Sequence, residues 1–97
     1  MDTKFRIEIE ERAKYEIIDA FEWYENQQIG LGNDFLQALE FAFRDIQRTP
    51  KGYRKYKFHR QYPLISFPYV VLYEIVRDIL YIDAVFHTKR NPIDKIL

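Results

Sequence analysis

The residues best suited to chemistry in this chain are cations and imidazoles, and they concentrate in its second half. Cleaving RNA without a metal requires a base for the 2′-hydroxyl, an acid for the leaving oxygen and cations that hold the phosphate. The candidates for these roles are Lys57, His59, Arg60, His87, Lys89 and Arg90. Charged residues on a half-exposed sheet can equally form only its solvated face, so a nuclease-like and a non-catalytic interpretation both stay open.

Other chemistries find little support. The chain has no cysteine, which excludes disulfides, thiolate metal sites and cysteine nucleophiles. Ser66 is its only serine, and it contains no phosphate-binding or dinucleotide-binding glycine loop. His59, His87 and Asp83 could meet on neighbouring strands, but two histidines at unrelated spacing are more typical of ordinary surface residues. We therefore expect no metal and no cofactor.

The charges of the chain are divided unevenly. Residues 1–50 carry 11 acidic and 6 basic side chains and residues 51–97 carry 4 and 9, so the halves stand at −5 and +5. Such asymmetry indicates a basic face that meets an anionic partner. The alternative is that the two halves pair with each other or are simply solvated.

Length and composition indicate one globular domain over residues 1–97. A chain of this size needs a rich core, and 47% hydrophobic residues, with 18% aromatic, can supply one. No apolar run reaches the roughly 20 residues that span a bilayer. The N-terminus lacks the apolar stretch of a secretory signal. We expect a cytoplasmic protein without membrane contact.

Two amphipathic helices follow an N-terminal strand. Strict alternation over residues 4–10 predicts the strand. Apolar residues then recur at helical spacing from Arg12 to about Gln28, and again in a second stripe that Gly32 or Asn33 can cap. The Thr49-Pro50 pair ends the second helix, because the residue before proline is steered away from helical geometry. Only about four residues, 29–32, separate the two predicted helices, and so short a loop predicts that they form an antiparallel hairpin.

The rest of the chain is predicted to be β. Alternation over residues 54–60 predicts a strand with charge on one side, which Gln61-Tyr62-Pro63 breaks. Residues 69–76 and 79–87 are rich in β-branched and aromatic residues, and a tight turn at Arg77-Asp78 joins them. The tail 88–97 is predicted to be a loop or a short turn of helix.

These elements define an α+β fold with the order β-α-α-β-β-β. The simplest burial of their apolar stripes packs the helical hairpin on one face of a small, mainly antiparallel four-stranded sheet. The sequence does not fix the order of the strands. The core is predicted to contain Phe5, Ile7, Ile17, Phe21, Leu39, Phe43, Val71, Tyr73, Ile82 and Ala84 or its neighbours.

Four local matches, in order along nearly the whole chain, make it resemble the RelE/ParE superfamily of bacterial toxins, also described as plasmid-stabilisation proteins. An aromatic cluster near the end of the first helix precedes Gly30-Leu31-Gly32 and Phe35, similar to the helix junction of the family. Pro50 precedes a basic strand that ends at Arg60. The stretches 67–75 and 79–92 resemble the Phe-Pro-Tyr strand of the family and its ending with histidine, arginine and proline.

The resemblance implies the toxin of a type II toxin–antitoxin module. ParE-like members poison DNA gyrase, whereas RelE-like members are ribosome-dependent mRNA endonucleases (mRNA interferases). We favour the ParE-like branch, because Val70 stands where RelE-like toxins tend to hold an arginine and no tyrosine follows Tyr81. For an endoribonuclease the catalytic candidates are Arg60, His87 and Arg90. An inactive member that binds nucleic acid or a partner is the remaining alternative.

The resemblance also implies partners. A cognate antitoxin should wrap the toxin, with Trp23, Tyr24 or Tyr62 as exposed anchors, and contact with operator DNA would occur only through the antitoxin. The target would be DNA gyrase, or the ribosome with mRNA in the alternative branch. The residues expected to face nucleic acid or the target are Arg54, Lys57, His59, Arg60, Lys89 and Arg90.

Overall fold

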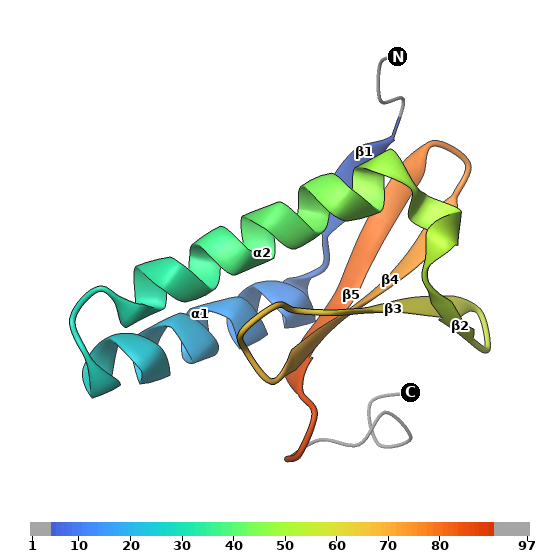
Figure 1. The fold of residues 1–97 in the computed structure, drawn as a ribbon. Coiled ribbons are helices and arrows are strands. Elements are labelled where there is room, and N and C mark those ends of the chain that lie inside the picture. Colours follow the sequence, from blue (N-terminus) through green and yellow to red (C-terminus); the bar gives the residue numbers. More distant parts are fainter. Residues whose placement is uncertain (1–4, 91–97) are drawn as a thin grey trace.

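The computed structural model describes residues 5–90, which form a helical hairpin and one sheet (Figure 1). The helices are α1 (Glu11–Gln27) and α2 (Leu31–Arg48), followed by the short 3-10 helix η1 (Pro50–Gly52). The strands are β1 (Arg6–Ile9), β2 (Arg54–Tyr56), β3 (His59–Pro63), β4 (Tyr69–Val76) and β5 (Ile79–His87). None of the helices in this part of the chain is long and apolar enough to cross a membrane. Beyond Arg90, the predicted tail lies outside the described residues.

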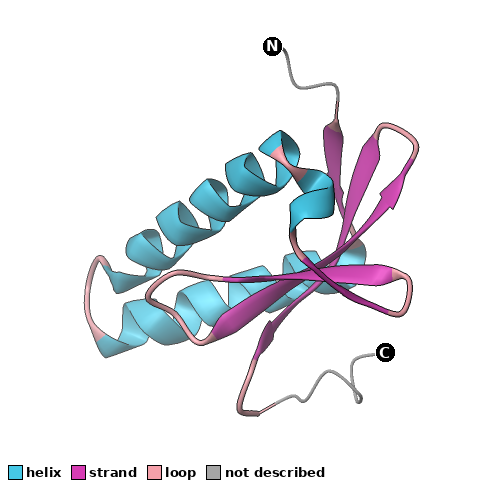
Figure 2. Cartoon of the chain, turned by 45° about the vertical axis from the view of Figure 1, so that its right-hand side comes forward, coloured by secondary structure: helices cyan, strands magenta, loops and turns pink. Residues whose placement is uncertain are grey.

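The predicted α+β architecture is confirmed, with five strands in place of four. The sheet has the order β1-β5-β4-β3-β2, in which β1 runs parallel to β5 and all other neighbours are antiparallel. Both helices lie in one layer against one face of this sheet (Figure 2). We call this the inner face, and the opposite one the outer face.

The additional strand arises because the predicted strand over residues 54–60 is a hairpin. Lys57 and Phe58 form a turn between β2 and β3, and Lys57 has a positive φ of 57°. The predicted break at Gln61-Tyr62-Pro63 is wrong, since these residues continue β3. Proline fits there because the amide of Leu64 donates to Tyr69 on β4, so the nitrogen of Pro63 points the other way. The nitrogen of Pro63 thus faces the side of β3 on which β2 lies, and the pairing of β2 with β3 ends at Gln61, before Pro63.

The junction between the helices differs from the expected cap. Helix α2 begins at Leu31, after Gly30 in the left-handed conformation (φ 93°), and neither Gly32 nor Asn33 caps it. Instead the carboxylate of Glu25 on α1 accepts hydrogen bonds from the amides of Gly30 (3.0 Å) and Gly32 (3.0 Å). A negative side chain suits the exposed amides and the positive dipole end of a helix. One helix therefore supplies the N-terminal cap of the other.

The core between the helices and the inner face follows the predicted set closely. Leu39, Val71, Tyr73 and Ile82 are buried, and most of the other predicted residues pack against them while partly exposed. Rings from different elements meet at one end, where Phe35 lies 5.2 Å from Tyr69 and 5.5 Å from Phe67. Ala84 is buried in a second, smaller cluster with Val70, Leu72 and Phe86.

A bulge in β5 explains the position of Ala84. Leu72 pairs with Ala84 and Tyr73 with Ile82, which leaves Asp83 as an extra residue between them. Because side chains alternate between faces, one extra residue reverses the alternation along the rest of the strand. Leu80 and Ile82 belong to the inner core before the bulge, whereas Val85 belongs to it after the bulge.

We predict that Gly32→Ala destabilises the protein, although alanine favours helices over glycine by about 1 kcal/mol. A Cβ at Gly32 would lie 2.8 Å from both the ring and the carbonyl oxygen of Phe21, so the helices would have to separate. The expected loss is about 1–3 kcal/mol of unfolding free energy, measured by urea denaturation. Gly52→Ala is the control, with its nearest atom at 3.4 Å, and should change stability by less than about 0.5 kcal/mol. A Gly32→Ala protein as stable as the wild type would contradict this packing.

Candidate functional site

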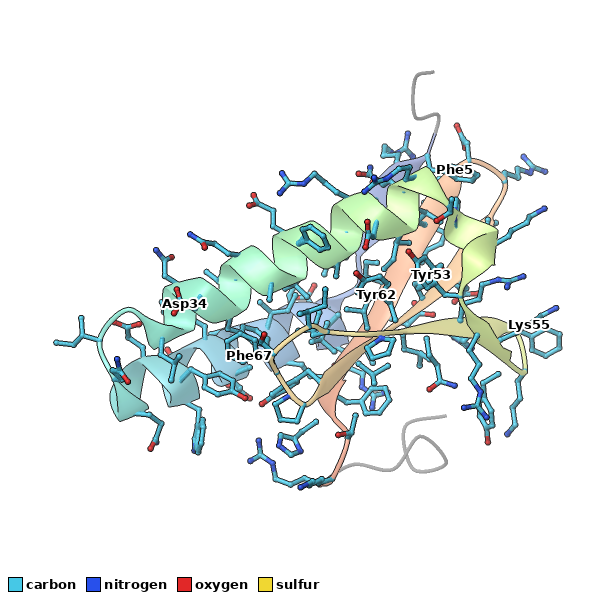
Figure 3. The ribbon with its side chains drawn as sticks, viewed as in Figure 1. Phe5, Asp34, Tyr53, Lys55, Tyr62 and Phe67 are labelled. Carbon is cyan, nitrogen blue, oxygen red and sulfur yellow. The ribbon has the colours of Figure 1, made fainter. Side chains whose placement is uncertain are left out.

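A groove lined by cations lies at the end of the sheet where the η1, β2, β3 and β4–β5 segments meet. Its volume is about 420 Å³, and Phe5 and Lys55 lie at this end of the molecule in Figure 3. We call it the basic groove; its lining residues are Phe5, Lys51, Lys55, Phe58, Arg60, Ile75 and Arg77. Within the described residues no carboxylate lines it. Its four cations therefore create a positive potential beside the apolar side chains of Phe5, Phe58 and Ile75.

Arg60 is the cation of this groove that the protein itself holds in place. Its Nη1 donates hydrogen bonds to the carbonyl oxygens of Lys51 (3.1 Å) and Tyr53 (3.0 Å). The hydroxyl of Tyr73 donates to the carbonyl of Pro50 in the same segment. Burial raises the pKa of Tyr73 to about 12, so this hydroxyl remains a donor at neutral pH. Arg60 thus ties η1 to the sheet as well as contributing charge.

Phe58 gives the groove an exposed aromatic rim. Its side chain is 87% exposed at the tip of the β2–β3 turn, next to Lys57, whose ammonium lies 5.4 Å from the centre of the Tyr56 ring. An exposed aromatic beside cations can stack on a base or contact an apolar side chain while the cations hold an anion. The arrangement suits an anionic macromolecule.

The second group of predicted residues lies at the end of β5. Arg90 donates a hydrogen bond from Nη2 to the hydroxyl of Tyr69 (3.2 Å), and the ring of His87 meets that of Tyr69 edge to face at 5.2 Å. His87 and Arg90 line a groove of about 400 Å³ between α1 and β5, together with Glu16, Asp19 and Trp23. Lys89 is exposed beside them.

His87 is poorly placed to act as a general base. Its Nδ1 accepts hydrogen bonds from the amides of Lys89 (3.2 Å) and Arg90 (3.3 Å), which assigns the proton of the neutral ring to Nε2. Burial first, and then the charges of Arg90 and Lys89, lower the pKa of His87 below its usual range. The neutral ring is favoured, yet neither nitrogen offers a free lone pair to a substrate.

The structure does not bring the three catalytic candidates together. Arg60 pairs with Tyr73 across β3 and β4, whereas His87 pairs with Tyr69, four residues along β4. At about 3.3 Å per residue the two positions are offset by roughly 13 Å along the strands, and β4 lies between them. A base, an acid and a phosphate-binding cation would have to meet around one phosphate, and of the three candidates only His87 and Arg90 line the same groove.

The remaining predicted residues lie elsewhere. Arg54 is exposed on β2, and Lys57 is exposed in the turn. His59 lies on the outer face, where its Nε2 is 2.8 Å from Asp83 Oδ2 and 3.7 Å from Glu74 Oε2. The pKa of Asp83 is raised to about 8, mainly because the carboxyl is partly buried. A hydrogen bond with Glu74 and the negative charge of Glu74 raise it further.

An apolar groove of about 840 Å³ lies between α2 and the loop that joins β3 to β4. Phe41 (47% exposed) and Ile65 (61% exposed) line it, together with Leu31, Phe67 and Pro68. Figure 3 labels Asp34 and Phe67, which lie on its two sides. An exposed apolar concavity of this kind is typical of a surface that another protein covers.

Two of the three expected aromatic anchors are not exposed. Trp23 is 48% exposed, but Tyr24 and Tyr62 are only 8% and 5% exposed. Tyr24 packs among Phe35, Phe67 and Tyr69. Tyr62 donates a hydrogen bond from its hydroxyl to Asp45 (2.7 Å) on α2. Both are parts of the core, and Phe41 and Ile65 take their place as exposed apolar candidates.

Comparisons with known proteins identify the family of this chain and a solved structure with a similar fold. Residues 7–92 match the family model described as "ParE toxin of type II toxin-antitoxin system, parDE". The fold is similar to a chain of the solved structure "Chromosomal ParDE TA system from P. aeruginosa", with a TM-score of 0.76 and 10% identity. That match covers 89% of this chain and 98% of the other. A search of curated protein sequences found no match. The chain belongs to the ParE toxin family of type II toxin–antitoxin systems.

We predict that nitrogen-resolved NMR will find His87 in the Nε2–H form, with a pKa below its ordinary value of 6.5. Arg90→Ala should raise this pKa toward 6.5, because it removes a positive charge that opposes protonation. Arg44→Ala on α2, which removes a charge outside this groove, should leave it unchanged. An Nδ1–H form or a pKa above 6.5 would contradict the hydrogen bonds described at this ring.

Proposed function

We propose that this ParE-family chain inhibits growth by poisoning DNA gyrase, and that a cognate antitoxin neutralises it in the cytoplasm. The observation that carries the proposal is the basic groove, which presents Lys51, Lys55 and Arg77 to solvent with no carboxylate among its described lining residues. Gyrase acts on DNA, and phosphates attract such a surface through counterion release and electrostatic steering.

The described geometry also favours a mechanism without bond-breaking by the toxin itself. The endonuclease alternative needs Arg60, His87 and Arg90 around one phosphate, but β-sheet register separates Arg60 from the other two. Amides also occupy the Nδ1 lone pair of His87. The toxin would then act by binding the enzyme–DNA complex and blocking its cycle.

We predict that reversing the charges of Lys55 and Arg77 reduces toxicity and gyrase inhibition at least about tenfold, since steering by charge changes association rates by roughly 10- to 1,000-fold. Lys55→Glu with Arg77→Glu is preferable to a change at Arg60, whose hydrogen bonds to η1 also stabilise the fold. The measurements are supercoiling and DNA-cleavage assays with purified gyrase, repeated at several salt concentrations.

The matched control reverses Lys14 and Arg44, two exposed cations on α1 and α2, and so changes net charge by the same amount. The control should remain fully active. Equal loss of activity in both double variants would argue against the groove. Cleavage of ribosome-bound mRNA that His87→Ala abolishes, with gyrase untouched, would favour the endonuclease alternative.

The antitoxin is proposed to cover the apolar groove beside α2. We predict that Phe41→Asp with Ile65→Asp weakens the complex with the cognate antitoxin, sought as a small protein encoded by an adjacent gene, by at least about 30-fold. Truncating or charging a central apolar anchor typically costs 2 kcal/mol or more, which is about that factor. Binding is measured by calorimetry after co-purification, and the melting temperature of each variant serves as the folding control.

Phe58→Asp is the matched control, since Phe58 is an exposed aromatic on the other end of the molecule. It should leave antitoxin binding intact. Equal binding to the wild type and to the Phe41 and Ile65 double variant would mean that the antitoxin binds elsewhere. If the two wild-type proteins elute separately at micromolar concentration, they are not a toxin–antitoxin pair.

A further inference from the structure

The outer face of the sheet brings together three potential metal ligands from three adjacent strands. Arg60 pairs with Tyr73, so the next residues along the antiparallel pair, His59 on β3 and Glu74 on β4, lie side by side. The bulge in β5 adds Asp83 next to them. One nitrogen and two carboxylate oxygens, one from each residue, all lie within 4.8 Å of one another.

These distances match what one metal ion requires. Ligand atoms about 2.1 Å from a tetrahedral ion are roughly 3.4 Å from each other. The Nε2 atom of His59 is 2.8 Å from the oxygen of Asp83 and 3.7 Å from that of Glu74, and the ligand atoms of all three residues lie within 4.8 Å of one another. Side-chain shifts of up to about 1.4 Å would bring the three donors to the spacing of one ion. The side chains are 18%, 36% and 20% exposed for His59, Glu74 and Asp83, which leaves a path for an ion from solvent.

The local electrostatics favour a cation at this position. Glu74 and Glu10 both place negative charge near Asp83, and Arg12 supplies an opposing positive charge. Two partly buried carboxylates at such short range repel each other unless a proton or a metal ion lies between them. A divalent ion would neutralise both carboxylates at once and use the imidazole as a third ligand.

We propose that His59, Glu74 and Asp83 form a binding site for a divalent transition-metal ion, with Zn²⁺ as the best fit. An imidazole with two carboxylates suits Zn²⁺, whereas Ca²⁺ and Mg²⁺ select sites made of oxygen ligands alone. Three protein ligands leave a fourth position for water. Because each ligand comes from a different strand, the ion joins β3, β4 and β5 and stabilises the sheet.

The other nitrogen of His59 limits the affinity of this site. Nδ1 is buried and has no hydrogen-bond partner within the described part of the chain. Metal-binding histidines usually donate that N–H to an acceptor, and losing such a partner typically weakens binding about 10- to 100-fold. We therefore expect a site of moderate affinity that is filled only when Zn²⁺ is available.

The test uses the full-length, untagged protein after treatment with chelator, titrated with ZnCl₂ alone by calorimetry and with CoCl₂ by visible absorption. We expect one Zn²⁺ per chain, a melting temperature that rises with Zn²⁺ concentration, and a Co²⁺ spectrum of a four-coordinate site. MgCl₂ at the same concentrations should have no effect. Absence of saturable Zn²⁺ binding below about 1 mM, or an equal response to MgCl₂, would overturn the proposal.

The variants Glu74→Gln and Asp83→Asn preserve shape and remove a ligand charge. Each should weaken Zn²⁺ binding at least about 100-fold, beyond what loss of an outer partner costs. His87→Ala is the matched control, because it removes the other histidine and should leave binding unchanged. Zn²⁺ binding that survives both carboxylate variants, or that disappears in His87→Ala, would place the ion elsewhere and refute this site.

Discussion

The single extra residue in β5 is the constraint on which both faces of the sheet depend. Asp83 interrupts the pairing of β4 with β5, and side chains beyond it change face. Val85 can therefore enter the inner core after Leu80 and Ile82, while Ala84 and Phe86 join the outer cluster. The same bulge directs Asp83 toward Glu74 and His59. Without the bulge, Ala84 and Phe86 would face the helices in place of Val85.

Elements whose signals are local could be predicted from the sequence, and those that depend on distant groups could not. Strands 69–76 and 79–87 have the predicted bounds because a β-branched, aromatic composition and a tight turn determine them. The cap of α2 was missed because Glu25 supplies it from the other helix. The hairpin within residues 54–63 was missed because the alternation of charge continues through the turn at Lys57. Lys57 has a positive φ there, and a lysine gives no sign of that backbone conformation in the sequence.

The residues of the candidate surfaces also differ in whether the sequence places them together or only the fold does. His87, Lys89 and Arg90 are neighbours in sequence, so any fold would place them together. Lys51, Lys55 and Arg77 meet only because η1, β2 and the β4–β5 turn converge at one end of the sheet. Strand register puts Glu74 beside His59, and no sequence spacing indicates it. Tyr24 and Tyr62 were expected to be exposed because aromatic type alone does not tell which face of an element is covered.

The arrangement of charge gives a reason for the unequal halves of the chain. The ion pairs Arg6–Glu8, Arg12–Glu16 and Arg48–Asp45 each join two residues of the acidic half. They consume cations there and leave the excess of acid on the two helices uncompensated. In the basic half, the carboxylates Glu74 and Asp83 face His59 on the outer face and so do not neutralise the basic groove. A chain with zero net charge can therefore keep a strongly positive surface for an anionic partner. The helices, acidic on their exposed side, would repel the anionic target proposed above and so favour one orientation of binding.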